Sequence, residues 1–235
     1  MNSKKIGTTI AVLIAAVGIT ATASADNFLV VNDTSSTSCD TIEAALTALT
    51  HTFTRLTTAE TTALTPNDVM TTYNAVFWMG SPSSGTEHDW CMALMDAGGN
   101  LLVADNDFGY FYGGGTYPIY TTYFESTYVS DAGSSGTLTG QGIMTGINPD
   151  ISSDPYPDDF TISGANGTVI FDAPSTNVAG TAIERTPVTE TYRGIYLSWD
   201  FVNTSAADVN SITAAIVAYL SEPVIPVELM SFSIE

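Results

Sequence analysis

The sequence has 235 residues, of which 44% are hydrophobic, and its 25 acidic residues against five Lys and Arg give a formal net charge of −20. A globular chain of this length buries about 70% of the surface that its unfolded form exposes, which argues against intrinsic disorder. Proteins that bind nucleic acids or anionic membranes take much of their affinity from Lys and Arg, so the charge argues against both kinds of partner. The composition therefore indicates a compact acidic domain without indicating an activity.

Residues 1–25 have the three parts of a secretory signal peptide. Lys4 and Lys5 give a positive amino end, residues 10–19 form an apolar stretch too short to span a bilayer, and residues 23–25 read Ala-Ser-Ala, a typical cleavage site. Cleavage would remove both lysines and leave 25 acidic residues against three arginines, a formal charge of −22. No later apolar run of the sequence is long enough to cross a membrane. We therefore expect an exported bacterial protein, secreted or at the cell surface, without membrane insertion.

From residue 26 to residue 104, strand patterns alternate with helical patterns. Three of the strand patterns are short apolar runs, as in strands covered on both faces, and the pattern at 52–56 alternates between polar and apolar residues. The helical patterns repeat apolar residues at intervals of three and four. The expected strands are 28–32, 52–56, 75–80 and 100–104, and the expected helices have apolar faces over 42–49, 69–73 and 90–97. This order predicts a doubly wound, mostly parallel sheet with right-handed crossovers.

Capping signals support the predicted helices. Asp40 with Glu43 three residues later is a capping-box pattern, which predicts that the first helix begins at Asp40. Thr65 before Pro66 is typical of a helix start, and the glycine pair at 98–99 is typical of a helix end. Local signals and periodicity therefore agree on where the helices lie.

The pattern changes between residues 105 and 167. This segment is rich in Gly, Ser, Thr, Tyr and Asp and has no helical period, so we expect an irregular insertion that carries irregular strands and turns. Strands are expected again at 168–171, 182–185 and 193–199. A last helix is predicted to begin at Ser205, with Asp208 in the capping-box position. Residues 223–235 form an extended tail with two prolines, so the predicted domain covers residues 26–222.

Four segments carry strand and turn motifs that point to a family. They are Phe28–Asp33, Tyr73–Gly80, Met95–Ala104 and Tyr192–Phe201. In these segments the sequence resembles the class I glutamine amidotransferase-like domains, in the divergent form found in secreted bacterial proteins. The resemblance implies a flavodoxin-like α/β fold over most of the mature chain, with the 105–167 segment inserted and an extended C-terminal strand. Strand and turn motifs specify a fold much more than an activity.

The resemblance does not extend to the catalytic residues of that family. Its enzymes place a nucleophilic Cys on the turn after the strand that corresponds to residues 100–104, and take a His and an acid from a later segment. Here the turn over residues 105–109 reads Asp-Asn-Asp-Phe-Gly, and His51 and His88 both precede it. Without a thiolate and an imidazole in reach of each other, this chemistry has neither nucleophile nor base. No catalytic residue is therefore predicted.

Acidic residues are the candidate ligand site. In the expected fold Asp33, Asp105 and Asp107 follow parallel strands and gather at the carboxyl edge of the sheet, the usual crevice for ligands. Carboxylates oppose anions and supply the hard oxygen ligands that calcium prefers, so calcium is the predicted cofactor. Residues 154–159, Asp-Pro-Tyr-Pro-Asp-Asp, form a second acidic cluster. The alternative is that these acids are turn and cap residues exposed to water.

Cys39 and Cys91 are the two cysteines of the chain. In an exported protein an even count favours a disulfide, and two buried thiols are the alternative. The strands that precede them, 28–32 and 75–80, are neighbours in the flavodoxin-like order, so we expect both cysteines near the same edge. Their disulfide would close a loop of about 50 residues and contribute about 3 to 4 kcal/mol.

Seven aromatic residues lie between positions 110 and 124 in a glycine-rich stretch. Flat rings there would stack on a sugar or on a partner's surface, and the alternative is that they form a small core beneath the insertion.

The sequence as a whole predicts an exported, non-catalytic binding or surface-assembly module of unknown ligand. The alternative is a secreted hydrolase that uses the acidic residues at the carboxyl edge, which leaves its status as an enzyme open. The expected partners are other surface or secreted proteins, or a second copy of the chain bound through the C-terminal strand at 227–234, because an extended apolar segment can add to a free sheet edge. Nucleic acid is not an expected partner.

Overall fold

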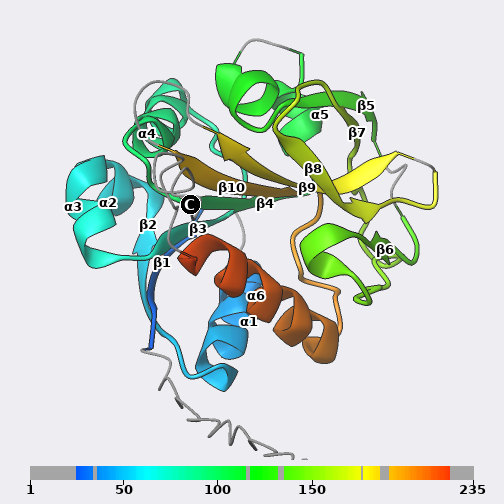
Figure 1. Ribbon diagram of the computed structural model, residues 1–235, viewed down its shortest axis with the longest axis horizontal. Coiled ribbons are helices and arrows are strands. Elements are labelled where there is room, and N and C mark those ends of the chain that lie inside the picture. Colours follow the sequence, from blue (N-terminus) through cyan, green and yellow to red (C-terminus); the bar gives the residue numbers. More distant parts are fainter. Residues whose placement is uncertain are drawn as a thin grey trace, which may run out of the picture.

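The computed structural model describes residues 25–33, 36–114, 117–131, 135–175, 177–185 and 191–222. They form one central sheet with helices on both faces (Figure 1). The strand order is β2-β1-β3-β4-β10-β9-β7-β5, with β8 paired to β9 and β6 paired to β8. The sheet therefore consists of a parallel half that begins at β2 and an antiparallel half that begins at β9.

The parallel half has the flavodoxin-like strand order. Its five strands are β1 (Asn27–Asn32), β2 (Thr52–Thr57), β3 (Ala75–Met79), β4 (Leu101–Ala104) and β10 (Tyr192–Leu197). Their order, β2-β1-β3-β4-β10, is the 2-1-3-4-5 order of doubly wound sheets. Every residue of β3 and β4 is buried, as their continuous apolar runs predict. The predicted flavodoxin-like fold class is confirmed.

Residues 105–167, expected to be irregular, supply much of the antiparallel half. The strands of this half are β5 (Ser126–Ser130), β6 (Thr139–Gly140), β7 (Asp159–Ile162), β8 (Gly167–Asp172) and β9 (Val178–Arg185). The same segment also contains the helical turns α5 (Phe108–Tyr112), η1 (Ile119–Tyr123) and η2 (Gly142–Met144). Strands of two to five residues are too short to show a clear alternation of apolar and polar side chains.

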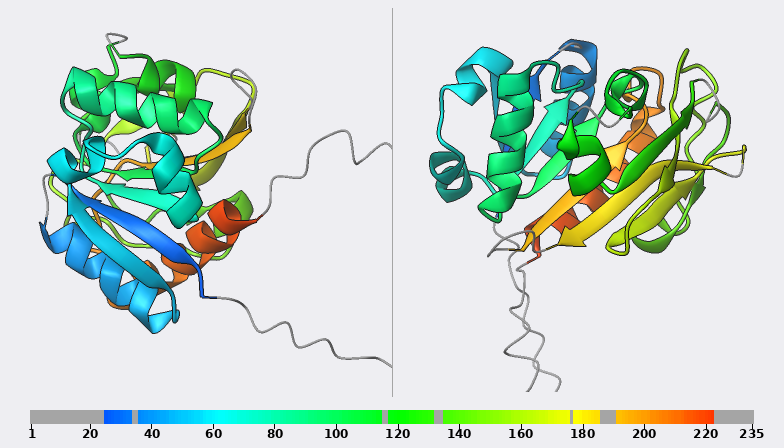
Figure 2. Two further views of the ribbon diagram at one scale, coloured as in Figure 1. Left: turned by 90° about the vertical axis from the view of Figure 1, so that its left-hand side faces the viewer. Right: turned by 90° about the horizontal axis from the view of Figure 1, so that it is seen from above.

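Helices cover the two faces of the sheet (Figures 1 and 2). One face carries α1 (Ser36–Ala48) and α6 (Ala206–Ser221), and the other carries α2 (Thr58–Thr62), α3 (Pro66–Thr72) and α4 (Gly85–Asp96) together with α5 and η1. Successive residues of β3 pack into opposite layers: Phe77 contributes to the core beneath α1 and α6, and Trp78 to the core beneath α3 and α4. The core is thus two apolar layers divided by the sheet.

Two of the predicted helix starts are confirmed by their hydrogen bonds. The side chain of Thr65 accepts the backbone N–H of Asp68, and Pro66 occupies the first turn of α3. The side chain of Ser205 accepts the backbone N–H of Asp208 at the start of α6. Both caps satisfy backbone donors that a helix leaves without a partner.

The predicted start of the first helix at Asp40 is wrong, because α1 begins at Ser36. Asp40 lies one turn inside the helix, and its Oδ1 accepts a hydrogen bond from Arg55 Nη1 of β2 at 2.6 Å. Arg55 Nη1 also lies 3.5 Å from Glu43 Oε1. The acid pair that resembles a capping box therefore holds the arginine of the neighbouring strand.

The predicted disulfide between Cys39 and Cys91 is wrong: both cysteines are free and buried. Cys39 lies in α1 and Cys91 in α4, and these helices pack on opposite faces of the sheet. The chain moves from β1 outward to β2 through α1, but from β3 in the opposite direction to β4 through α4. Right-handed crossovers that run in opposite directions place their helices on opposite faces, so the sheet separates the two thiols.

Among the described residues, no helix has the length and apolar character needed to cross a bilayer. The predicted signal peptide, apart from Ala25, and the predicted strand at 227–234 lie outside the described residues.

Candidate functional site

Four parallel strands end side by side at the carboxyl edge of the sheet. Asp33 follows β1, Ser81 follows β3, Asp105 follows β4, and Asp200 follows β10. The backbone N–H of Asp105 donates to the carbonyl of Leu197 at 3.1 Å, which joins the ends of β4 and β10. The structure therefore brings the predicted residues Asp33 and Asp105 to one edge, where open α/β sheets usually bind ligands.

Asp105 is buried at this edge, with 6% of its surface exposed. Its Oδ1 accepts hydrogen bonds from Ser81 Oγ at 2.5 Å and from the backbone N–H of Asp107 at 2.8 Å. Burial raises the pKa of Asp105 to about 6, although both hydrogen bonds favour the charged form, and the charges of Asp107 and Asp200 raise it further. The protonation of Asp105 therefore changes in the mildly acidic range.

Asp33 is a second carboxyl of the same edge. Its Oδ2 accepts a hydrogen bond from Trp78 Nε1 at 3.1 Å. Burial raises the pKa of Asp33 to about 6, and the charges of Glu87 and Asp105 add to the shift. Neighbouring carboxylates repel each other, so this edge favours states in which one carboxyl is neutral or both are compensated.

Asp107 occupies the N-cap position of α5. Its side chain makes no capping hydrogen bond, and its backbone has φ −120° and ψ 1°. Burial raises the pKa of Asp107, and the charge of Asp131 raises it further. Within the described part of the chain, no three His, Cys, Asp or Glu side chains are grouped as metal ligands. Calcium bound by Asp33, Asp105 and Asp107 therefore stays a prediction without a preformed ligand set.

Asp158 lies beneath the start of α5. Its Oδ2 accepts the backbone N–H groups of Gly109 at 2.7 Å and Tyr110 at 3.2 Å, and Tyr196 Oη lies 3.4 Å away. Burial raises the pKa of Asp158 to about 8, against the lowering effect of the two backbone hydrogen bonds. The Asp158 carboxylate thus accepts hydrogen bonds from the two backbone amides that follow the turn after β4.

The acids of the predicted cluster at 154–159 accept hydrogen bonds from different groups. Asp154 Oδ1 accepts the backbone N–H of Tyr156 at 3.3 Å, whereas Asp159 Oδ2 accepts Asn177 Nδ2 at 3.0 Å. Burial raises the pKa of Asp154 to about 6, and the charge of Asp200 adds to the shift. Asp154 therefore belongs electrostatically with the carboxyl edge. Asp158 does so too, because, besides burial, the charges of Asp107 and Asp105 raise its pKa, whereas Asp159 binds Asn177, beyond the insertion.

A crevice of about 330 Å³ opens at the carboxyl edge. It is lined by Ser81, Ser83, Asp105, Asn106, Asp107, Phe111, Tyr112 and Asp200. Phe111 is 63% exposed and its neighbour Tyr110 is 56% exposed, whereas Phe108 and Phe124 are fully buried. The aromatic run is therefore divided: Phe108 and Phe124 belong to a core beneath the insertion, whereas Phe111 is exposed at the crevice.

His88 supports the crevice from beneath, which its position in the sequence does not reveal. Its ring is buried in the first turn of α4, stacks on Tyr117 with centroids 4.0 Å apart, and meets Tyr112 edge-on at 4.9 Å. Neither ring nitrogen has a hydrogen-bond partner among the described residues, and burial lowers the pKa of His88. His88 is thus a neutral ring that packs behind Tyr112, and the only sequence signal for it is the nearby run of aromatic residues.

Comparison with solved structures agrees with this geometry. The chain is similar to an exo-β-1,4-mannosidase from Opitutaceae bacterium strain TAV5 (TM-score 0.54, 7% identity, 83% of this chain and 35% of that chain). It is similar to a protein assigned as part of a GMP synthase from Thermoplasma acidophilum (TM-score 0.54, 10% identity, 83% of this chain and 96% of that chain). It is also similar to a ThuA-like protein from Bacteroides uniformis (TM-score 0.52, 10% identity, 82% of this chain and 91% of that chain).

These likenesses establish the fold. The chain spans about a third of the mannosidase but nearly the whole of the other two proteins. No protein-family model matches the sequence, and no curated protein matches it. At identities of 10% or less the common feature is architecture. The chain therefore has a flavodoxin-like fold of the class I glutamine amidotransferase type.

Proposed function

We propose that this chain is an exported, non-catalytic binding domain whose carboxyl-edge crevice takes a neutral, hydroxyl-rich ligand such as a saccharide. The observation that carries the proposal is the composition of the crevice, in which carboxyl and amide groups stand beside the rings of Phe111 and Tyr112. Binding sites for small molecules combine apolar walls with a few polar groups in this way.

The turn after β4 argues against acyl transfer. A nucleophile on such a turn is normally held in a strained backbone conformation, and the amides that follow it bind the oxyanion. Here Asp107 lies on the turn with φ −120°, outside the left-handed region. The amides of Gly109 and Tyr110 are already hydrogen-bonded to Asp158. These features support binding over the chemistry of glutamine amidotransferases.

The charge of the crevice argues against an anionic ligand. Asp105, Asp107 and Asp200 line it, and burial raises the pKa of each. An anion placed among them would add to the repulsion that these carboxyls already experience. A neutral ligand adds no charge and still satisfies their oxygens.

A saccharide has the chemistry to bind both the polar groups and the aromatic ring that line the crevice. Carboxylate oxygens accept hydrogen bonds from ligand hydroxyls, and the amide of Asn106 both donates and accepts. The open face of the Phe111 ring suits the C–H face of a sugar ring. The volume of about 330 Å³ lies within the range of small-molecule sites, roughly 300 to 1,000 Å³.

Export is part of the proposal. The three-part signal over residues 1–25 supports it, together with the loss of both lysines that cleavage would cause. An acidic surface without lysine suits a protein that stays soluble outside the cell. Other surface or secreted proteins would be its partners.

A secreted hydrolase is the second candidate. The observation in its favour is the pair Asp33 and Asp105, both with a pKa raised to about 6. A carboxylic acid with such a pKa can donate a proton near neutral pH while a second carboxylate acts as base or nucleophile. This candidate requires turnover, which the binding proposal does not.

Calorimetric titration with neutral mannan, xylan and cellulose oligosaccharides tests the proposal. We expect at least one series to bind, and Phe111→Ala to weaken binding by about tenfold, the effect of losing roughly 1.4 kcal/mol of contact. The control is Ile143→Ala, which removes an exposed apolar side chain outside the crevice and should bind normally.

Three results would contradict the binding proposal. The first is the absence of binding to every series, and the second is an equal loss of binding in both variants. The third is release of shortened sugars by the unmodified protein that disappears in Asp105→Asn, which would establish the hydrolase instead.

A further inference from the structure

A row of aromatic rings leads away from the carboxyl-edge crevice, over α5 to β5. Tyr112 and Phe111 line the crevice, and Tyr110 and Tyr128 continue the row beyond it. The ring centroids of successive members lie 6.1, 5.1 and 6.2 Å apart. We call these four rings the aromatic strip. It extends the aromatic wall of the crevice outward along the surface of the molecule.

The two central rings of the aromatic strip are exposed to solvent. Phe111 and Tyr110 have more than half of their surface exposed, whereas Phe108 of the same helix is fully buried. Tyr112 and Tyr128, at the two ends of the strip, are half-buried. Apolar side chains that are exposed together, rather than singly, indicate a binding surface.

The rings of the strip are held in place at α5. The backbone N–H of Tyr110 donates to Asp158 Oδ2 at 3.2 Å. Tyr128 packs directly on α5, because a Cβ at Gly113 would collide with the Cβ of Tyr128. The close approach of β5 to α5 therefore requires glycine at this position, and it fixes the outer end of the strip.

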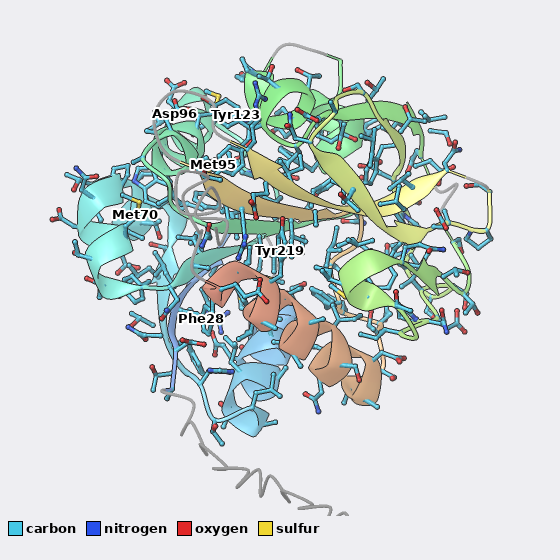
Figure 3. All side chains as sticks on the ribbon, in the orientation of Figure 1. Phe28, Met70, Met95, Asp96, Tyr123 and Tyr219 are labelled. Atoms are coloured by element: carbon cyan, nitrogen blue, oxygen red, sulfur yellow. The ribbon has the colours of Figure 1, made fainter. Side chains whose placement is uncertain are left out.

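The segment that carries the strip is also attached to α4. Tyr112 Oη donates to the carbonyl of Ser83, just before α4, at 3.2 Å. Tyr123 Oη of η1 donates to Asp96 Oδ1, at the end of α4, at 2.7 Å, and Figure 3 shows these two side chains beside each other. Rings that are fixed before a ligand arrives lose little conformational freedom when it binds.

The orientation of the rings restricts the shape of the ligand. Tyr110 is nearly perpendicular to Phe111, at 77°, and to Tyr128, at 74°. A flat, ribbon-like ligand cannot lie on rings that face in different directions, whereas a chain whose units turn relative to one another can place successive faces on them. Burial raises the pKa of Tyr128, and the charges of Asp158 and Asp131 raise it further, so carboxylate oxygens that accept hydroxyl groups lie near the outer end of the strip.

We propose that the aromatic strip binds further sugar units of a neutral polysaccharide chain that turns from unit to unit, while the crevice binds one of them. This inference rests on the proposed binding of a saccharide in the crevice. A protein partner is the weaker alternative, because a specific protein interface uses about 20 to 30 residues a side, and the strip is a single row of four rings.

Calorimetric titration with two series of oligosaccharides, from disaccharide to hexasaccharide, tests the proposal. The xylan backbone turns from unit to unit, and the cellulose chain is a flat ribbon. We expect the xylan hexasaccharide to bind at least about tenfold more tightly than the disaccharide, and the gain with length to be smaller in the cellulose series.

Variants of Tyr110 assign this gain to the strip. Tyr110→Ala should reduce the ratio of the two xylan affinities to about twofold, because it removes an exposed ring. Tyr110→Phe keeps the ring and should retain the ratio. The control is Ile143→Ala in η2, whose neighbour Met144 belongs to the core layer on the other face of the sheet from Phe108, and both affinities should stay unchanged.

The proposal is overturned, and the proposed function stands, if affinity does not rise with length, if the gain is no larger for xylan than for cellulose, or if Tyr110→Ala retains it. Loss of the gain in Tyr110→Phe would also overturn it, because a hydroxyl rather than a ring would then be the contact. If the neutral oligosaccharides of every series fail to bind, both proposals fall. Self-association of the unmodified protein that Tyr110→Ala removes, measured by sedimentation, would show a second copy as the occupant and overturn the proposal.

Discussion

The two edges of the parallel sheet handle polar groups in opposite ways. At the amino edge, Arg193 and Asn100 bind the carbonyls at the end of α6, so charge and hydrogen-bonding capacity are matched. At the carboxyl edge, the half-buried Asp33 and the buried Asp105 and Asp158 have pKa values that burial raises to between about 6 and about 8. In the described part of the chain, the ion pairs of the three arginines involve Asp40, Glu43, Glu125, Glu184 and Glu222 and none of these carboxyls. The amino edge therefore stabilises the fold. At the carboxyl edge the burial of carboxyl groups is unfavourable, as is often found in ligand sites.

Breaking the amino edge should have the largest effect. Arg193 is 8% exposed, and Arg193→Met would leave the carbonyls of Tyr219 and Glu222 without their donor. We expect a loss of about 2 to 4 kcal/mol in the free energy of unfolding in urea. Arg55→Met is the control, because its partner Asp40 is 69% exposed, and it should lose less than about 1 kcal/mol. Similar losses in the two variants would contradict the special role of the amino edge.

Crowding the carboxyl edge should have the next largest effect. A Cβ at Gly109 would lie 2.7 Å from Tyr120 Oη and 2.8 Å from Asp158 Oδ2, so Gly109→Ala must displace the Asp158 carboxyl. We expect a destabilisation of about 1 to 3 kcal/mol, measured by chemical denaturation. Gly114→Ala meets no atom within 4 Å and should be nearly neutral. A neutral Gly109→Ala would show that the contact of Asp158 with α5 is loose.

The pH dependence of stability sharpens the contrast between the edges. Asp33, Asp105 and Asp154 have pKa values of about 6 in the folded chain and Asp158 about 8, all above the unfolded value of about 3.9. A raised pKa stabilises the fold fully below about pH 4, and this stabilisation is lost as the pH rises through about 6 and then about 8. We expect a melting temperature at least about 4 °C lower at pH 8.5 than at pH 4.5.

Asp158→Asn should flatten the part of this dependence above pH 6.5, because it removes the carboxyl with the highest pKa. Asp89→Asn, on the exposed surface of α4, should leave the curve unchanged in shape. A melting temperature that rises with pH would contradict this account, because it would show that ionising the carboxyls of the carboxyl edge does not destabilise the fold.

Calcium should have the smallest effect. An ion held by Asp33, Asp105 and Asp107 would relieve part of the repulsion among the carboxyls, and at a concentration equal to Kd it would add about 0.4 kcal/mol. We expect millimolar calcium to raise the melting temperature more than sodium at matched ionic strength, and less so in Asp105→Asn. Equal stabilisation by the two salts would leave calcium without a site.

The parallel half was predictable from sequence: its edge strand β2 shows an alternating pattern, and its other strands are buried on both faces. Such strands leave continuous apolar runs, as in β3 and β4, and the helices between them have regular apolar faces and caps such as Thr65 and Ser205. In the antiparallel half, β8 and β9 overlap the strands expected at 168–171 and 182–185, but β5, β6 and β7 were not predictable, because they are short and rich in Ser, Thr and Gly. The predicted disulfide was wrong because α1 and α4 lie on opposite faces of the sheet. The face that a helix covers depends on the direction of its crossover, which the residue pattern does not show.

The candidate site was predictable only where it follows strand ends. Asp33 and Asp105 could be assigned to one edge because parallel strands end together. The contact between Asp158 and Gly109 joins residues 49 positions apart, and no periodic pattern encodes it. The stacking of His88 on Tyr117 likewise depends on how the insertion folds back over α4. Pairings of this kind arise from tertiary packing alone.

The most direct test of the central claim, a binding crevice without catalysis, is a single NMR titration of the 15N-labelled protein with the neutral oligosaccharides. It records the amides of the protein and the signals of the sugar together. We predict shifts of the amides around Asp105, Asp107 and Phe111, with the amides of α6 unmoved and the sugar unchanged over days. Shifts elsewhere, no shifts at all, or the appearance of shorter sugars would contradict the account.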